Sequence, residues 1–340
     1  MKKIFSQLIN MSSINSLILI KTIIVFSYPI IVLIGLITNS ISFMIFSRKR
    51  FQNTIFSTYY RCLIICQTMN LILPINKMFE SNLNLFLSRI SNFVCKLRFF
   101  YPNVNLGSSA WLLVAISFDR YLSISYPTKF MFRKQNSFQL LISLFIICSN
   151  LGFFTTKWFY YLKETRVNVT NKANNQTYIA DSFKCSSPGI WVQALDLVHL
   201  NLLPFLIMIL FTSLTARHVF RSRKIINIIS SSSSNRTSSQ SNDRKFAIIS
   251  ISINILFLFL NLPQTVLFMI NDYTNIFISL KDLYTLLDSF VYFLLYFNLI
   301  TTFFINFYVN SMFKNELIAF IFNHKSNNLF SKSIARSIRR

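Results

Sequence analysis

The residue types that usually carry out catalysis are scarce in this chain. Its 340 residues include only three His and ten acidic side chains. No His-Glu-x-x-His pair, glycine-rich phosphate loop or activated nucleophile occurs at a usable spacing. His199 is a lone histidine in an apolar stretch, where packing or pocket lining is a more frequent role than metal binding. The sequence therefore predicts that the protein is not an enzyme and uses no metal or cofactor.

The polar group with the clearest chemical meaning is Phe118-Asp119-Arg120-Tyr121, which follows a long apolar stretch. An arginine at the edge of a bilayer is costly unless it is paired, so it marks a functional site by default. An isolated arginine would instead extend its side chain to the lipid headgroups. Arg120 is not isolated, because an acid and a tyrosine flank it.

Five cysteines are present, and their positions limit how they can pair. Cys62, Cys66 and Cys148 lie within apolar stretches, where a thiol usually acts as a small buried hydrophobe. Cys95 begins one apolar stretch and Cys185 precedes another, so both fall on the outer side in the orientation argued below. A disulfide between them is therefore chemically allowed, and it would hold the long outer loop across the helix mouths.

The composition indicates what positions these groups. Hydrophobic residues make up 53% of the chain and charged residues only 13%, whereas soluble domains carry about 25% charged residues. The net charge of +24 could suggest a nucleic-acid partner, but such a protein displays its charge on a soluble surface. Here the basic residues separate apolar blocks, which indicates a multi-pass membrane protein in contact with lipid and predicts no nucleic-acid partner.

The apolar blocks are long enough to cross a bilayer as helices, which takes about 20 residues. The alternating pattern of a membrane barrel and the internal repeat of many transporters are both absent from the sequence. No convincing cleavable signal peptide precedes the first block. We expect an all-α membrane protein with a seven-transmembrane helix bundle, whose spans cover about residues 22–46, 55–79, 93–125, 138–160, 191–220, 245–270 and 283–309.

The basic residues predict the orientation. With the N-terminus outside, 21 of the 34 Lys and Arg fall in inner segments, but only three acids do so: Asp119, Asp243 and Glu316. Three glycosylation sequons then lie outside, at Asn10, Asn168 and Asn175, although Asn235 also matches and lies inside. The predicted organisation is an extracellular tail (1–21), a seven-span domain (22–309) and a cytoplasmic segment (310–340), in the plasma membrane.

Two prolines interrupt predicted spans. Pro204 and Pro263 each remove a backbone hydrogen bond and bend the fifth and sixth helices. A static kink and a hinge both remain possible readings. The inner loop between these spans contains Ser230–Ser234 followed by further polar residues, which is typical of a flexible linker.

The seven spans, the outer Cys95 and Asp119-Arg120-Tyr121, with Arg120 twenty-five residues after that cysteine, together resemble the rhodopsin-like (class A) G protein-coupled receptors. The resemblance covers about residues 20–322, and among these receptors the chain is most similar to those for neuropeptides. It implies a receptor that binds an extracellular ligand and activates a heterotrimeric G protein when the inner end of the sixth helix moves outward.

The resemblance also implies roles for individual residues. It implies a Cys95–Cys185 disulfide, and an inner ion pair between Arg120 and Asp243. Asn39 matches the asparagine of the first span, and residues 312–321 are similar to the family's surface-lying eighth helix. The residues implied in coupling and activation are Asp119, Arg120, Tyr121, Asp243, Phe257, Pro263 and Asn306.

Several positions depart from the family pattern. Gln67 replaces the aspartate of the usual sodium site, and Asn261 replaces the tryptophan two residues before the sixth-span proline. The fifth-span tyrosine is Thr212, and the NPxxY motif reads Asn306-Phe307-Tyr308-Val309-Asn310. These departures keep open a non-signalling pseudoreceptor. A secondary transporter or channel is the alternative from another class, with Gln67 and Asp196 as its limited support.

The expected ligand is a peptide. Pro102 stands where amine receptors of the family carry an aspartate, and residues 283–309 contain no lysine that could attach retinal. Asp196 must find a cation or polar partner, which suits a basic or amidated peptide, with a lipid or small molecule as the alternative. By family position the pocket residues are Phe99, Gln193, Asp196, Gln264, Phe268, Asp288, Tyr292 and Tyr296.

Overall fold

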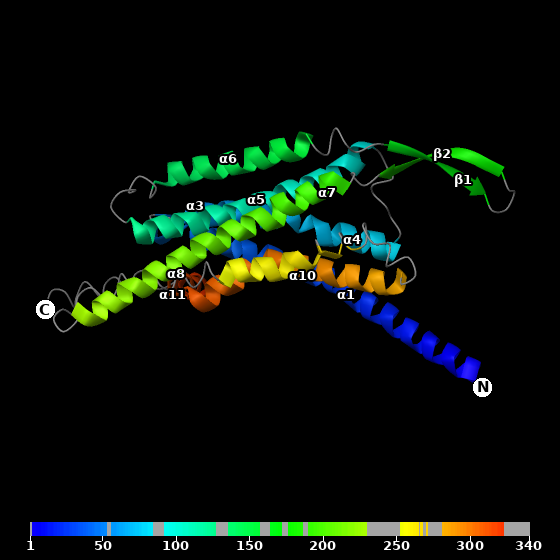
Figure 1. Ribbon diagram of the computed structural model, residues 1–340, viewed down its shortest axis with the longest axis horizontal. Coiled ribbons are helices and arrows are strands. Elements are labelled where there is room, and N and C mark those ends of the chain that lie inside the picture. Colours follow the sequence, from blue (N-terminus) through cyan, green and yellow to red (C-terminus); the bar gives the residue numbers. More distant parts are fainter. Residues whose placement is uncertain are drawn as a thin grey trace.

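The computed structural model describes residues 2–52, 56–83, 92–126, 135–156, 164–171, 176–185, 190–229, 252–264, 266–267, 270 and 281–322. Long helices lie side by side along the long axis of the molecule (Figure 1). The N-terminal end of α1 (Lys2–Phe46) and a hairpin of β1 (Glu164–Asn171) and β2 (Gln176–Cys185) lie at one end of the bundle. The short helix α11 (Ser311–Phe322) lies towards the other end.

Most helices reproduce the predicted spans closely, but α1 begins at Lys2, twenty residues before the predicted first span and within the predicted extracellular tail. The third, fourth and seventh correspond to α5 (Asn92–Ser125), α6 (Asn136–Phe154) and α10 (Lys281–Val309), and the sixth contains a helix at Ser252–Gln264. A short helix, α2 (Lys49–Gln52), follows α1. In the part of the chain described here, four helical segments are long and apolar enough to cross a membrane by composition alone: Leu19–Phe46, Asn136–Phe154, Ala194–His218 and Leu283–Val309.

The second span is divided into α3 (Ser57–Asn70) and α4 (Ile72–Leu83). Leu71 separates them, and its N–H bonds the carbonyl of Thr68, 3.1 Å away, as in a tighter helical turn. Pro74 explains the break, because it has no N–H to donate to the carbonyl of Asn70 one turn earlier.

The fifth span also changes its helical winding. Helix α7 (Ile190–Leu197) passes through a π-helical turn, Val198–Leu202, into α8 (Leu203–Ile229). The turn ends two residues before Pro204, so the predicted bend takes the form of a π-helical insertion.

The outer loop between the fourth and fifth spans forms a structure that the sequence did not predict. Strands β1 and β2 pair antiparallel, with Glu164 opposite Cys185 and an irregularity between Thr165 and Val167. This hairpin stands outside the helical bundle (Figure 1). Strand β2 contacts α5, so the end of the hairpin lies against the third span.

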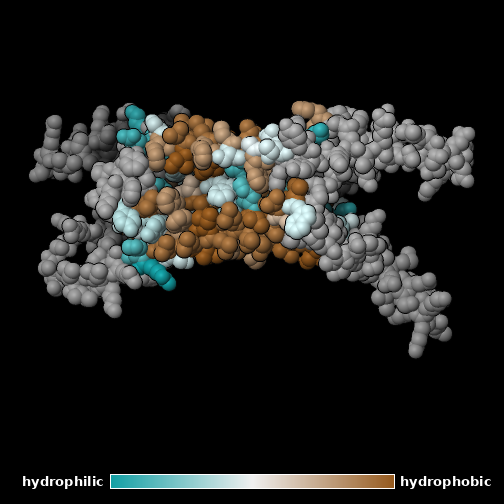
Figure 2. Space-filling model, turned by 45° about the horizontal axis from the view of Figure 1, so that its top comes forward, coloured by the Kyte–Doolittle hydropathy of each residue, from teal (hydrophilic) through white to brown (hydrophobic). Residues whose placement is uncertain are grey.

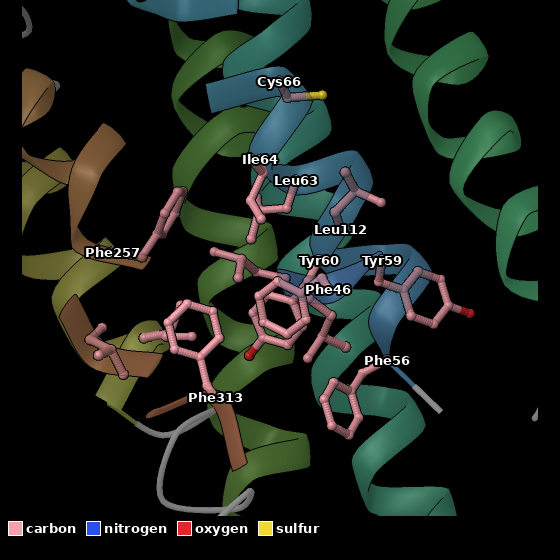
Figure 3. Packing of buried hydrophobic residues seen from close by; sticks show 14 of the residues in the cluster. Phe46, Phe56, Tyr59, Tyr60, Leu63, Ile64, Cys66, Leu112, Phe257 and Phe313 are labelled. Atoms are coloured by element: carbon pink, nitrogen blue, oxygen red, sulfur yellow. The ribbon is translucent and has the colours of Figure 1, made fainter. Parts of the chain in front are cut away.

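The outer surface and the interior suit a membrane protein. The face of the molecule in Figure 2 is mainly apolar in its middle, with a few polar residues there and more of them towards both ends. The main core lies in the half of the bundle that the sequence predicts to be inner, and we call it the inner core (Figure 3). It joins α1, α2, α3, α5, α8, α10, α11 and the 252–264 helix, and its largest side chains include Phe46, Tyr59, Tyr60, Leu63, Leu112, Phe257 and Phe313.

Candidate functional site

Asp119 and Arg120 are buried near the C-terminal end of α5, the predicted inner end, and Tyr121 is half-buried. Asp119 is 4% exposed and Arg120 is 9% exposed. The Arg120 guanidinium lies over the ring of Phe56, with 3.7 Å between its central carbon and the ring centroid. The arginine therefore does not extend to lipid headgroups, which was the alternative role for an isolated arginine.

Neighbouring aromatic rings connect this group to α8. The Tyr121 ring lies 5.8 Å from Phe211 and 6.1 Å from His218, between ring centroids. Phe118, one helical turn before Tyr121, also contacts Phe211, with 4.9 Å between the ring centroids. The proposed ionic partner, Asp243, lies outside the described residues, so the Arg120–Asp243 pair stays a prediction.

The 252–264 helix carries four of the residues singled out from the sequence: Phe257, Asn261, Pro263 and Gln264. Phe257 is buried in the inner core, and Asn261 donates to its backbone carbonyl over 2.6 Å. Pro263 follows near the outer end of the helix and is half-buried. Asn254 was not singled out, yet its amide bonds the hydroxyls of Ser117 at 2.9 Å and Thr212 at 3.0 Å.

Buried polar groups near the middle of the bundle connect α10 to α1 and α3. Gln67 donates to the Thr302 hydroxyl over 2.9 Å, and Asn39 donates to the Leu299 carbonyl over 3.3 Å. Asn306 donates to the carbonyl of Thr302 within its own helix, 2.8 Å away. Gln67 thus meets Thr302, one turn from Asn306, in a neutral contact where the family pattern has a carboxylate.

The inner rim contains an ion-pair cluster. Glu316 on α11 accepts from Arg48 at 2.9 Å and from Arg50 at 3.1 Å, and its side chain is 14% exposed. Burial alone would raise the pKa of Glu316, but the two arginines lower it below its ordinary value. The cluster fixes α11 to the end of the first span. Elsewhere on α11, Phe313 and Leu317 enter the inner core while Ile318 and Ile321 are exposed, as in an amphipathic surface helix.

The predicted pocket residues are only partly brought together. Asp196, Gln264, Asp288 and Tyr292 are half-buried, in the predicted outer halves of the fifth, sixth and seventh spans. Tyr296 instead packs in a cluster with Tyr28, at 5.1 Å between ring centroids, and its hydroxyl donates to the Leu73 carbonyl. Its placement supports the packing role. The side chains of Phe99 and Gln193, and all of Phe268, lie outside the described residues.

A second polar cluster lies beside the π-helical turn. The Nε2 of His199 is 3.1 Å from Oδ1 of Asn150 on α6, and its ring stacks on Phe153 at 4.0 Å. The side-chain oxygen of Asn150 approaches Gly107 on α5 so closely that a Cβ at Gly107 would clash with it. His199 is therefore a packed, hydrogen-bonded group. In the part of the chain that the structure describes, no three His, Cys, Asp or Glu side chains gather as a metal site.

The disulfide and glycosylation predictions remain untested. The backbones of Cys95 and Cys185 belong to α5 and β2, two elements that contact each other, but their side chains lie outside the described residues. Cys62, Cys66 and Cys148 are free thiols. Asn10 and Asn168 lie in α1 and β1, with side chains that are not described, and Asn175 lies outside the described residues.

Sequence reasoning missed Asn254, Thr302, Asn150 and the Arg48–Glu316 pair. Their common signal was available: each is a polar or charged residue in or next to an apolar span, where it needs a partner. The partner itself lies 42 to 268 residues away along the chain, so no local pattern could identify it.

Comparison with known proteins gives one consistent result. A family model described as "7 transmembrane receptor (rhodopsin family)" matches residues 38–305. Atypical chemokine receptor 3 of Rattus norvegicus is 32% identical over 127 residues, which cover 36% of this chain and 33% of that receptor. The Homo sapiens protein of the same name is 32% identical over 132 residues, covering 37% and 34%. The chain thus aligns with about a third of the length of these curated relatives.

Proposed function

The chain belongs to the rhodopsin family of seven-transmembrane receptors, and we propose that it is a plasma-membrane receptor that binds an extracellular polypeptide and activates a heterotrimeric G protein. The family match confirms the predicted seven-helix membrane fold and the prediction that the protein is not an enzyme. It also removes the transporter or channel alternative. Ligand class, coupling and the outer location of the N-terminus are parts of the proposal.

The burial of Arg120 is the observation that carries this proposal. A cation at 9% exposure in the inner end of a span is expensive to hold. Its contact with the ring of Phe56, the residue before α3, holds it inside the protein. A buried arginine of this kind is stable in one arrangement of the helices and becomes available to a partner protein in another. This property suits a two-state switch at the cytoplasmic face.

Activation is then a population shift between these arrangements. A ligand that contacts the outer half more favourably in the open state raises the population of that state. Pro263 and the π-helical turn before Pro204 are points where the sixth and fifth helices can change direction. Outward movement of the sixth helix at its inner end would expose Arg120 to the G protein.

The polypeptide ligand is supported by two facts. Asp196, near the end of α7 that joins the π-helical turn, and Asp288, seven residues after the start of α10, place half-buried carboxylates in the predicted outer half of the bundle, where basic groups of a ligand could pair with them. The relatives are named as receptors for chemokines, which are polypeptides. A basic or amidated peptide fits both.

A receptor that binds ligand without activating a G protein is the second candidate. The neutral Gln67–Thr302 contact and the altered Asn306-Phe307-Tyr308-Val309-Asn310 segment favour it, because both depart from the family pattern. The relatives are also named atypical receptors.

A cell assay separates the two candidates. Cells that express the protein would be screened with a library of neuropeptides and chemokines, with G-protein dissociation sensors for each Gα class and a ligand-binding readout. We expect ligand-dependent dissociation that Arg120→Ala abolishes at matched surface expression while binding remains. Binding without dissociation in the wild type would establish the second candidate, and dissociation that survives in Arg120→Ala would contradict the proposed role of Arg120.

A further inference from the structure

Asn254 on the 252–264 helix forms an unusual pair of hydrogen bonds. Its side chain is buried, at 7% exposure, among the apolar neighbours Ile253 and Phe257 of the inner core. One amide nitrogen donates to the hydroxyl of Ser117 on α5 at 2.9 Å and to that of Thr212 on α8 at 3.0 Å. A single side chain therefore connects the sixth span to both the third and the fifth.

Four other asparagines in the spans satisfy their amides locally, whereas Asn39 donates to the Leu299 carbonyl of a neighbouring helix. Asn105, Asn150, Asn261 and Asn306 each donate to the backbone carbonyl four residues earlier in their own helix. Such a bond moves with its helix and does not resist a change in helix packing. Asn254 instead reaches two other helices, so these bonds depend on how the three helices are arranged.

The partners are oriented to accept. The Ser117 hydroxyl donates its own hydrogen to the Leu113 carbonyl, 2.9 Å away, which leaves a lone pair for the Asn254 amide. Ser117 precedes Arg120 by three residues, so the two lie on the same face of α5, one turn apart. Thr212 stands where the family pattern has a larger tyrosine.

We propose that Asn254, Ser117 and Thr212 form a polar latch that holds the sixth helix in the resting arrangement and must open when that helix moves outward. The proposal rests on the receptor switching proposed above, and it assigns the resting state a contact within the described bundle. Because the two acceptors are on different helices, outward movement of the sixth helix breaks at least one of the bonds. Hydrogen bonds between membrane helices shift equilibria by about threefold each on average, so the latch biases the switch without preventing it.

A thiol-labelling experiment measures the latch without ligand or G protein. Ile253, at 4% exposure, belongs to the inner core and moves with the sixth helix, so Ile253→Cys reports its withdrawal from the core. The purified full-length receptor in lipid nanodiscs would be treated with a water-soluble thiol reagent, and labelling at each cysteine would be followed by peptide mass spectrometry. Native Cys66, at 4% exposure, serves as the internal control for loss of the fold.

In the Ile253→Cys background, Asn254→Leu should raise the labelling rate at residue 253 by about five- to tenfold, with Cys66 still protected. Ser117→Ala and Thr212→Val should each give about threefold, and neither should add to the effect of Asn254→Leu. Asn105→Leu is the matched control, because it removes an intrahelical bond on α5, and it should leave the rate unchanged.

The results distinguish the latch from the receptor function. An unchanged rate in Asn254→Leu, or full additivity of Ser117→Ala with it, overturns the latch whether or not the protein signals. If Cys66 is also labelled in Asn254→Leu, that variant has lost its fold, and the smaller change Asn254→Ser is tested in the same assay. A labelling rate at residue 253 that stays as slow in Asn254→Ser as in the Ile253→Cys background also overturns the latch. Raised labelling in Asn254→Leu without G-protein dissociation supports the latch and counts against the proposed coupling.

Discussion

The inner and outer halves of the bundle are packed in different ways. The inner core is a single cluster to which α1, α2, α3, α5, α8, α10, α11 and the 252–264 helix all contribute. Among the described residues the outer half has two separate clusters. One joins α1 to α10 through Val25, Tyr28, Ile31, Leu295 and Tyr296, and we call it the α1–α10 cluster. The other joins α5 to α6 through Val104 and Phe154, and we call it the α5–α6 cluster.

This difference suits a receptor. A single packed core changes between discrete arrangements rather than deforming gradually, so the inner half can act as a two-state element. Two outer clusters leave the positions between them less fixed, and the half-buried Asp196 and Asp288 belong to two different spans, the fifth and the seventh. A ligand that contacts both spans would alter their separation, and the inner core would respond as a unit.

The largest expected effect comes from truncating one fully buried phenylalanine in each half. Phe46 in the inner core contacts the rings of Phe51, Tyr60 and Phe313, so Phe46→Ala should cost about 3–5 kcal/mol of stability. Phe154, in the smaller α5–α6 cluster, has fewer neighbours to hold a cavity open, so Phe154→Ala should fall near or below the lower end of that range.

Thermal unfolding of both variants in the same detergent tests this comparison. A larger decrease in melting temperature for Phe46→Ala supports the contrast between one core and two clusters. Equal decreases would contradict it, because both side chains are completely buried in the wild type.

The sequence predicted the helices well because a membrane span is determined by local hydropathy. The bounds of α5 and α10 differ from the predicted blocks by at most two residues. The break at Leu71 was predictable in principle from Pro74. The contacts of Asn254 and Glu316 were not, because they join residues far apart in the chain through the packing of whole helices. The hairpin of β1 and β2 was also missed, since the sequence reasoning treated that loop only as a site for sequons and a disulfide.

A cross-link at the outer end is the next largest effect. We predict a disulfide between Cys95 and Cys185, which would compensate for the smaller outer clusters by fixing β2 to α5. Replacing both cysteines with serine should cost about 2–4 kcal/mol of stability. Peptide mapping under non-reducing conditions checks the bond directly, and two free thiols at these positions would rule it out.

Asp196 provides a test confined to the outer half. If a basic peptide activates the receptor, Asp196→Asn should lower its potency by about tenfold or more, equivalent to about 1.4 kcal/mol, because a cation of the ligand loses its partner. Basal signalling should not change, since the inner core is intact. A dose–response curve that does not shift would remove Asp196 from the ligand site.

Asp243 provides the corresponding test at the inner face. A pair between Arg120 and Asp243 across a partly screened surface would contribute about 0.5–1 kcal/mol, enough to change the resting equilibrium several-fold. Asp243→Asn should therefore raise basal G-protein dissociation while the potency of a peptide changes little. Unchanged basal activity at matched surface expression would argue that other contacts hold the resting state.

The smallest effect concerns the ion pairs of Glu316, which fix α11 to the inner end of the first span. Burial opposes ionisation of this carboxyl, yet the hydrogen bonds and charges of Arg48 and Arg50 lower its pKa below the ordinary value of 4.5. Because the folded pKa lies below the unfolded one, the stabilisation is complete above about pH 4.5 and is lost as the pH falls through the folded pKa. The arginine side chains are 38% and 59% exposed, so the ion pairs should contribute only about 0.2–1 kcal/mol of stability.

Melting temperatures of the wild type and Glu316→Gln should differ by a small, constant amount from pH 7 to pH 5 and converge towards pH 3. A difference that persists at pH 3 would show that Glu316 stabilises α11 through packing rather than through its charge.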